Sequence, residues 1–428
     1  MKRAAVTRIH LLATLGALLF LAACASGPVT HYSAPEGDWK ARITSQERNG
    51  IEVSAAVPSA SESEELFGKP LYKQGIQPVW LEITNGRNVY VNFLPVGLDP
   101  QYFTPLEVAN TDLKDKRKKN DPVSLVDQNF LNQGMGGLRV APGETRSGFI
   151  FSKLDEGTKA FNVDIIGPSG TSGIADFETF TFFIPVPGLK IDHYSVDWEN
   201  LYAADEWVDL DKDQLIQIVE QMTCRVTDKR GEGSGDPLNL LVIGFPTDVY
   251  TAFIRAGWDE TETVTRTSTM KTIGSFLSGG EYRYSPVSAL YVFGRPQDAA
   301  FQRARENIHE RNHLRLWMSR ARFEGVPVFI GQISRDIGVR FTTKTITTHK
   351  IDPNVDETRE FLLENLAYAQ SLKKFAYVGG VGEVTRDNPA GNLTGDPWFS
   401  DGYRIVLWVS SEPGPIDEVD FVEWRMPH

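Results

Sequence analysis

Short runs of β-branched and aromatic residues recur through the first half of the chain. They lie at residues 79–84, 89–93, 147–151 and 179–184. Turn-forming pairs separate them, among them Asn85-Gly86 and Pro142-Gly143. Several short strands with such turns are typical of two packed antiparallel sheets. The pattern therefore predicts an all-β, immunoglobulin-like sandwich over residues 39–189.

The second half of the chain alternates between helical and strand-like patterns. Residues 190–235 are expected to form a connector with one helix at 211–223, because Leu215, Ile218, Val219 and Met222 have helical spacing. A mixed α/β domain is expected over 236–411, followed by a tail at 412–428. Its predicted strands are 238–244, 287–293, 313–318, 326–333, 337–343 and 403–409, and its predicted helices are 248–256, 263–277, 299–308 and one starting near Asp352 or Asp356. The fold class is thus α+β with several domains.

The N-terminus has the pattern of a secretion signal. Lys2, Arg3 and Arg8 precede an apolar stretch at 11–20, which is too short to span a membrane as a mature helix. The following Leu21-Ala22-Ala23-Cys24 resembles the bacterial lipobox. That resemblance implies a signal peptide at 1–23, a lipid on Cys24 and a tether at 24–38, with sorting to the outer membrane because no aspartate follows the cysteine. An ordinary secretory signal with an incidental cysteine is the alternative.

Charge excludes one class of partner. The chain has 44 basic and 56 acidic residues, a net charge of −12. Nucleic-acid binding normally requires a basic face, so no nucleic-acid partner is expected.

Candidate chemistry is concentrated between residues 288 and 353. His313, Arg315 and Trp317 alternate with apolar residues, which is the period of a strand and places them on one face. His349 and Asp352 follow at a strand-to-helix junction, and Asp336 is expected in a hairpin between strands 326–333 and 337–343. If His313, His349, Asp336 and Asp352 converge, they would form an acid–base or metal site, with the two histidines as metal ligands and arginines such as Arg315 holding an anion. A structural polar network is the alternative, and we assign no cofactor.

Two further motifs in this region are compatible with more than one role. His309-Glu310-Arg311-Asn312-His313 matches the zinc-peptidase pattern, but that site needs a continuous helix through His313, where the alternation indicates a strand. Arg295 ends the strand at 287–293, where it would either pair with Asp298 or bind a phosphate. No G-x-S-x-G sequence is present, which disfavours a serine hydrolase.

Five motifs in order resemble the LssY C-terminal domain family over about residues 236–411. They are Pro237-Leu238-Asn239-Leu240-Leu241-Val242-Ile243-Gly244, Ala256-Gly257-Trp258, Pro286-Val287-Ser288-Ala289-Leu290-Tyr291-Val292-Phe293-Gly294-Arg295, Asn312-His313-Leu314-Arg315-Leu316-Trp317 and Thr348-His349-Lys350-Ile351-Asp352-Pro353. In that family the domain often follows membrane modules of the DedA or phosphatidic acid phosphatase kind. Those modules are absent here, so the resemblance implies an envelope location and carries over no phosphatase chemistry.

These observations together predict an outer-membrane-anchored envelope lipoprotein that acts as an accessory or binding module. Its expected partners are the membrane, through the N-terminal lipid, and an envelope protein or lipid. The alternative function is hydrolysis of a phosphate- or ester-containing envelope substrate by the His/Asp cluster.

Overall fold

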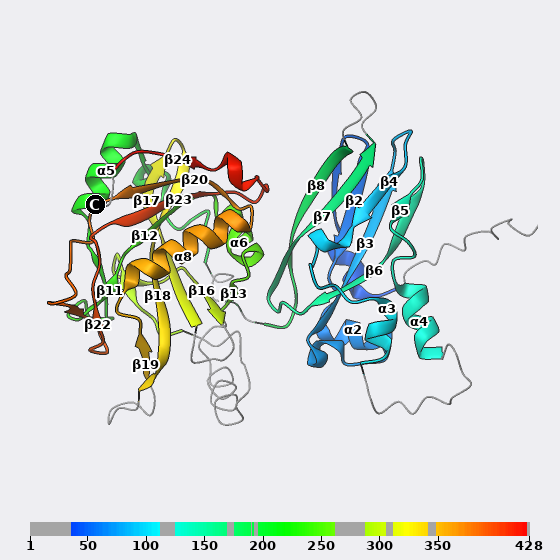
Figure 1. The fold of residues 1–428 in the computed structure, drawn as a ribbon, viewed down its shortest axis with the longest axis horizontal. Coiled ribbons are helices and arrows are strands. Elements are labelled where there is room, and N and C mark those ends of the chain that lie inside the picture. Colours follow the sequence, from blue (N-terminus) through cyan, green and yellow to red (C-terminus); the bar gives the residue numbers. More distant parts are fainter. Residues whose placement is uncertain are drawn as a thin grey trace, which may run out of the picture.

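The computed structural model describes residues 36–111, 125–168, 175–189, 191, 196–261, 287–304, 311–340 and 348–425. In these ranges the protein is mostly β, with several separate sheets, and Figure 1 shows the N-terminal and C-terminal halves as two bodies. None of the helices in these ranges is both long enough and apolar enough to cross a membrane. The signal peptide expected at 1–23, Cys24 and the helix expected at 263–277 lie outside the described residues.

Two four-stranded antiparallel sheets form the N-terminal half. The first has the order β1 (Thr44–Arg48), β2 (Ile51–Ala56), β3 (Ile76–Asn85), β6 (Thr145–Lys153), and the second has the order β5 (Arg139–Val140), β4 (Val91–Leu94), β7 (Thr158–Pro168), β8 (Ala175–Pro185). Side chains from both sheets, such as Val53, Val79, Phe93 and Phe182, are buried in one shared core. The strand periodicity of this half was therefore predictable from its sequence.

Three short helices add to this half, which was predicted to be all-β. They are α2 (Ala60–Phe67), α3 (Pro105–Ala109) and α4 (Leu125–Gln133). Phe149 and Phe151 of β6 alternate with Ile150, so they point away from the shared core and need a second apolar cover. Phe67 and Phe130 supply it from α2 and α4, with their rings stacked at 5.0 Å. The helices form because both faces of β6 are apolar.

One ten-stranded mixed sheet organises the C-terminal half. Its main path is β13 (Asp259–Glu260), β16 (Ala299–Ala304), β17 (Arg311–Phe323), β18 (Val326–Arg340), β12 (Leu240–Ile243), β23 (Arg404–Val409), β20 (Leu372–Val378), β24 (Asp420–Phe421), with β19 (Thr348–Ile351) beside β18 and β9 (Val208–Leu210) beside β17. Most neighbours are antiparallel, but β12 is parallel to β23, β9 to β17 and β24 to β20. The expected tail contributes β24, so it is part of the sheet.

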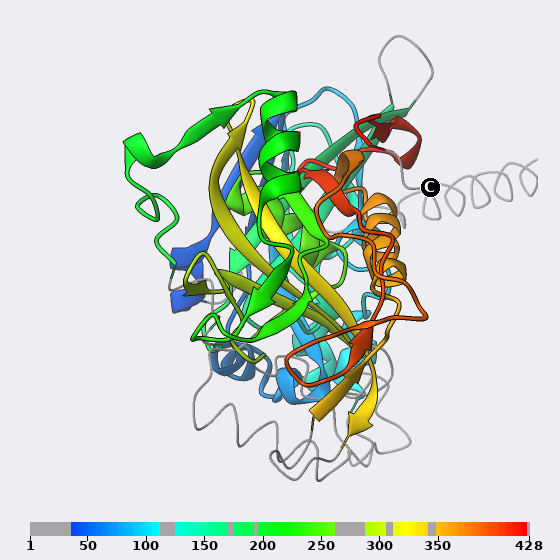
Figure 2. The same cartoon turned by 90° about the vertical axis from the view of Figure 1, so that its left-hand side faces the viewer.

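The two faces of this sheet have different covers. Helices α6 (Pro246–Arg255) and α8 (Val355–Tyr368) pack on one face with a core that includes Leu314 and Leu316. Figure 2 shows α8, in orange, on one side of the yellow strands β17 and β18. Helix α5 (Lys212–Gln221) packs on the other face, which also meets a small sheet ordered β11 (Ser234–Pro237), β10 (Arg225–Thr227), β14 (Tyr291–Val292), β15 (Arg295–Pro296).

The expected connector at 190–235 is in large part a piece of the C-terminal domain. Strand β9 pairs with β17, and Leu215, Ile216 and Val219 of α5 are buried against Leu241 of β12. The amphipathic pattern of α5 was recognised in the sequence, but its apolar side packs on the sheet and does not lie in a linker. The domain boundary expected at 236 therefore falls inside a packed unit.

The strand expected at 287–293 extends only over Tyr291–Val292, because the chain turns at Phe293 and Gly294 into β15. Two further local predictions were wrong. Residues 299–304 form strand β16 and not the start of a helix, because Ala299 and Phe301 are buried in the core and all six residues pair with β17. Asp336 is not in a hairpin, because β18 runs unbroken from Val326 to Arg340 and only a register shift marks the position between Asp336 and Gly338. Tertiary pairing overrides local propensity in both cases.

Candidate functional site

The polar face of β17 contains a close His–Asp contact. His313 Nε2 lies 2.7 Å from Oδ2 of Asp336, and both side chains are buried. His313 and Arg315 share the face opposite to Leu314 and Leu316, as the alternation predicted. His313 and Asp336, two members of the predicted cluster, are thus brought together by the fold, although Asp336 lies in a strand and not in the expected turn.

A larger hydrogen-bond network surrounds this contact. Arg315 donates from Nη1 to Oε1 of Gln332 at 2.9 Å, and Gln332 donates to the Ser334 hydroxyl at 2.9 Å. Asp236 accepts from Gln332 at 3.4 Å and from Asn392 at 2.9 Å. The network therefore ties β17 and β18 to β11 and to the loop that carries Asn392.

Arg311 completes the group at the end of β17. Its Nη1 donates to Oε1 of Gln302 on β16 at 2.7 Å, and its Nε lies 3.8 Å from Oδ2 of Asp336. Asp336 is consequently shared between a histidine and an arginine.

Burial controls the protonation of this network. It lowers the pKa of His313 to about 4, despite the opposing attraction of Asp336. Burial likewise lowers the pKa of Arg311 and Arg315 and raises the pKa of the Asp236 carboxyl. His313 is therefore a neutral imidazole at pH 7. A neutral imidazole beside a carboxylate is able to accept a proton or bind a metal, but either role also requires access to the reacting partner.

Of the other two members of the expected cluster, Asp352 is placed by the structure, and it makes contacts of its own. Asp352 uses Oδ1 to accept from the backbone N–H of Asn354 at 3.0 Å, and its own N–H donates to the carbonyl of Arg335. His349 lies in β19 opposite Val339, and its side chain lies outside the described residues. The helix expected to start near Asp352 or Asp356 is α8, which begins at Val355 with Asn354 at its N-cap position.

Metal binding gains no support from the part of the chain that the structure describes. No group of three or more His, Cys, Asp or Glu residues there is placed to hold a metal ion. The zinc-peptidase motif also requires a helix through His313, whereas Arg311–Phe323 is strand β17. His309 and Glu310 lie outside the described residues.

Arg295 pairs with Asp298, one of its two expected roles. The guanidinium contacts both carboxylate oxygens, at 2.9 and 2.8 Å. It also donates to the Tyr202 hydroxyl at 2.7 Å and to the carbonyl of Met318 at 2.6 Å. Asp298 in turn accepts from the backbone N–H of Met318. Arg295 thus holds the β14–β15 hairpin against β17.

A cavity of about 450 Å³ opens beside Arg295, on the same sheet face as the polar network. Most of its wall is apolar, and α5, β17, β18 and the β14–β15 hairpin contribute to it. Leu215, Ile218, Val219 and Met222 line one side and Val328 and Ile330 another. Neither His313 nor Asp336 lines this cavity.

A second, more polar cavity of about 620 Å³ lies between the two halves of the chain. Asp164 and Lys159 of β7 line it from one half, and Arg255 and Arg303 from the other. Close by, the Thr158 hydroxyl donates to Oε1 of Glu260 at 3.0 Å. Burial raises the pKa of Glu260 to about 8, so this contact between the halves involves a protonated carboxyl at neutral pH.

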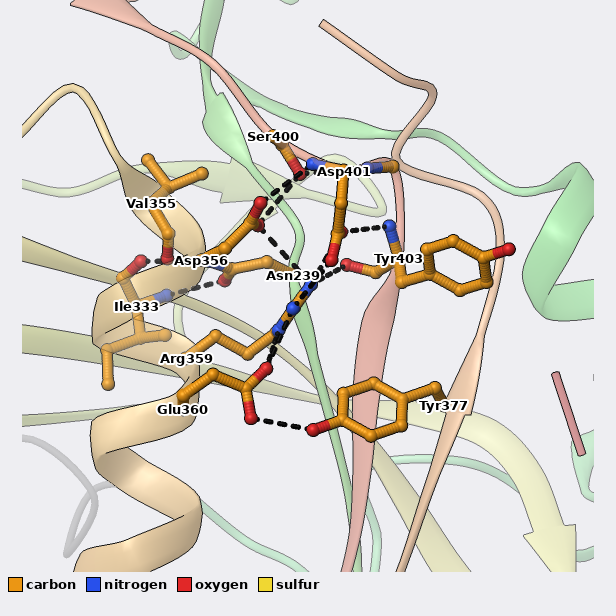
Figure 3. Close-up of polar contacts among 11 residues, drawn as sticks. Asn239, Ile333, Val355, Asp356, Arg359, Glu360, Tyr377, Ser400, Asp401 and Tyr403 are labelled. Atoms are coloured by element: carbon orange, nitrogen blue, oxygen red, sulfur yellow. Dashed lines mark hydrogen bonds and ion pairs between the residues drawn. The ribbon is translucent and has the colours of Figure 1, made fainter. Parts of the chain in front are cut away.

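A second charged cluster, which was not predicted from the sequence, surrounds Arg359 of α8 (Figure 3). Arg359 contacts both carboxylate oxygens of Asp401 at 2.9 Å and also contacts Glu360 at 2.7 Å and Asp356 at 3.3 Å. Tyr377 donates to Glu360 at 2.6 Å. The spacing of Arg359 from Asp356 and Glu360 on one helix was visible in the sequence, but nothing local indicated Asp401.

Asn239, also drawn in Figure 3, joins the start of α8 to the sheet. Its side chain accepts from the N–H of Ile333 at 3.0 Å and donates to the carbonyls of Ile333 and Val355 at 3.1 and 3.4 Å. Asn239 is fully buried, so these bonds satisfy an amide that would otherwise be costly to bury.

The fold and this site define a mixed α/β domain that is built on one large sheet. Helices α6 and α8 cover one face of the sheet, and the other face carries the polar network and the apolar cavity. Residues 216–403 match the model of the LssY C-terminus family, so this part of the chain is similar to that family. The match confirms the resemblance seen in the sequence and begins inside α5, in agreement with the packing of that helix. No curated protein matches the chain.

Proposed function

We propose that this protein is an envelope lipoprotein, held at the outer membrane by a lipid on Cys24, whose C-terminal domain is a binding module. The observation that carries the binding role is the open, mostly apolar cavity beside α5. Ligand sites are usually concave, apolar and 300–1,000 Å³ in volume, with a few polar groups at the edge. The Leu21–Cys24 signal supports the envelope location, and an envelope lipid or protein is the expected partner.

Hydrolysis is the second candidate, because one specific contact favours it. A neutral His313 at 2.7 Å from Asp336 has the pairing of a general base and its orienting carboxylate. However, His313 is only 7% exposed and lies outside the walls of both large cavities. A substrate would have to reach a buried imidazole, so binding is the better supported function.

We also propose that the N-terminal half is immunoglobulin-like. The chain leaves the first sheet after β3, forms β4 and β5 in the second, and returns to place β6 beside β3. It then crosses again to place β7 beside β4 and β8 beside β7. Such exchanges between two antiparallel sheets are Greek-key connections of the kind found in immunoglobulin-like sandwiches.

Fractionation and an activity assay test the proposed function together. We expect wild-type protein in the outer-membrane fraction and the Cys24→Ala variant in the soluble fraction, because the described residues contain no membrane-spanning helix. A Ser26→Ala variant is the matched control and should fractionate like wild type. Hydrolysis of p-nitrophenyl phosphate or acetate that is lost in His313→Ala would favour the hydrolase instead, and tight membrane association of Cys24→Ala would contradict the lipid anchor.

A further inference from the structure

The cavity beside α5 has a chemistry that restricts its ligand. Its polar side chains are Tyr202, Arg295, Ser319 and Arg320, and each is already paired within the protein. Tyr202 donates to the carbonyl of Met318 at 2.8 Å, Ser319 donates to the carbonyl of Val328 at 2.7 Å, and Arg320 contacts Glu206 at 2.8 Å. These groups therefore gain little from a polar ligand, and burial of apolar surface supplies the affinity.

Charge at the edge of this cavity is also balanced. Arg295 is paired with Asp298, and Arg320 is paired with Glu206. A fixed anion-binding site would instead present a cation without a carboxylate partner. The cavity is thus suited to a hydrocarbon segment whose headgroup, of whatever charge, stays in water.

The hairpin at the cavity edge holds an aromatic residue in a strained backbone conformation. Strands β14 and β15 are joined by Phe293 and Gly294, which have φ angles of 56° and 75°. Such a two-residue turn with both φ angles positive favours Asn-Gly, and a bulky side chain is disfavoured in the left-handed region. Phe293 nevertheless occupies it, is 48% exposed and lines the cavity. Strain of this kind is concentrated at ligand-binding positions.

We propose that this cavity binds a single acyl chain of an amphiphile, with the headgroup in solvent and Phe293 covering the chain at the entrance. This inference rests on the proposed binding function and names its ligand class. The volume of about 450 Å³ suits one flexible chain, and the exposed apolar side chains Val208, Ile218 and Phe293 provide a path from solvent to the buried wall. The acyl chain would come either from a free amphiphile or from the lipid on Cys24.

Titration calorimetry tests this on the chain from residue 24 onward with Cys24→Ala, using octanoate, decanoate and dodecanoate. We expect the affinity to rise roughly fourfold per added methylene while the chain is being buried (about 0.8 kcal/mol each). Dodecanol and a dodecanoyl lysophosphatidylcholine should bind within about fivefold of dodecanoate, because an exposed charge contributes little. Failure of all these probes to bind, or an affinity that depends on the headgroup and not on chain length, would overturn the proposal.

Matched variants locate the site. Ile218 and Ile416 are 44% and 48% exposed, and only Ile218 lines the cavity. Ile218→Glu should weaken dodecanoate binding at least tenfold because it places a charge in the apolar wall, whereas Ile416→Glu should leave it unchanged. Equal losses in both variants would refute this location. Phe293→Asn should raise the melting temperature, since asparagine suits the turn, and should lower the affinity; unchanged affinity would remove Phe293 from the site.

The two lipid sources are separated by comparing this chain with the lipidated wild type. Dodecanoate binding by both forms assigns the cavity to a free amphiphile, and binding only by the unlipidated form assigns it to the protein's own lipid. Both results support an acyl chain as the occupant. Failure of the lipid anchor and failure of acyl-chain binding are distinguishable. A wild-type protein that is not membrane-associated would contradict the anchor, but it would not change the result of the acyl-binding titrations.

Discussion

The two charged clusters of the C-terminal domain use similar side chains in opposite ways. Arg359 contacts three carboxylates, and although burial alone would lower its pKa, the hydrogen bonds that it donates to Asp401 and the nearby negative charges raise it. Arg315 instead donates to the neutral amide of Gln332, and burial lowers its pKa. The surroundings of Arg359 therefore stabilise its charged form, whereas the surroundings of Arg315 destabilise the charged form of that side chain.

This difference separates buried charged groups that only stabilise the fold from buried groups that can also change their protonation state. A buried arginine surrounded by carboxylates has a structural role. Here Arg359 connects α8 to the segment before β23. A buried histidine with a lowered pKa, beside a carboxylate that it shares with an arginine, is neutral at pH 7 and can gain a proton at lower pH. Experiments on the two clusters should therefore differ in size and in pH dependence.

The largest effect is expected from Arg359→Met. Removal of the guanidinium leaves Asp356, Glu360 and Asp401 close together without their cation, and breaking a buried ion pair in this way costs about 3–5 kcal/mol. Urea unfolding should show this loss in the free energy of unfolding. Arg359→Lys is the matched control and should recover part of it. A loss below about 1 kcal/mol in Arg359→Met would contradict a fastening role.

His313→Ala should have a smaller effect. It removes a partner of the buried Asp336, and an unsatisfied buried polar group costs about 1–3 kcal/mol. We expect this loss of stability with no change in metal content, measured by emission spectrometry on purified wild type and variant. Stoichiometric zinc in wild type that disappears in His313→Ala would show that the network is a metal site.

The pH dependence of stability distinguishes the clusters more sharply. His313 has a folded pKa of about 4, below the ordinary value of 6.5, so the unfolded chain binds more protons between these values. The contribution of His313 is therefore fully present above pH 6.5 and is lost as pH falls towards 4. Between pH 6.5 and 5 wild type should lose roughly 1–2 kcal/mol more than His313→Gln. Parallel pH profiles would contradict the burial of a neutral imidazole.

The smallest effect is expected from Tyr377→Phe at the edge of the Arg359 cluster. The variant loses the hydrogen bond from the tyrosine hydroxyl to Glu360, while Arg359 still contacts that carboxylate. The free energy of unfolding should fall by about 0.5–1.5 kcal/mol. A larger loss, approaching that of Arg359→Met, would mean that the cluster behaves as one cooperative unit, which a double-variant cycle would measure.

Sequence patterns predicted the parts of this site that depend on neighbours along the chain. Alternation placed His313 and Arg315 on one face of a strand, and the amphipathic pattern of α5 was recognised. Partners on other strands were harder to predict, because register and strand length are set by tertiary packing. Asp336 was assigned to a turn since the length of β18 has no local signal, and Asp401 was missed because it meets Arg359 across 42 residues.

The cavity was the least predictable feature. Its walls come from α5, the β14–β15 hairpin and two long strands, which no short motif joins. Phe293-Gly294 was part of a motif that resembles the family, yet no local pattern indicated that the phenylalanine would have a positive φ angle. Strained positions are where sequence-level reasoning is expected to fail.

The parallel pairing of β12 with β23 has a consequence for biosynthesis. Leu240 lies opposite Ile405, so the centre of the large sheet cannot close until nearly the whole polypeptide has left the ribosome. Pairing between strands so far apart in the sequence is slow, because the chain loses the entropy of closing the intervening loop before the contacts between the strands stabilise it. In the part of the chain that the structure describes, the strands of the N-terminal half pair only with one another, within residues 44–185, so this half can finish first. During that interval the apolar strand β12 would be without β23, its parallel neighbour, and the large sheet would remain open.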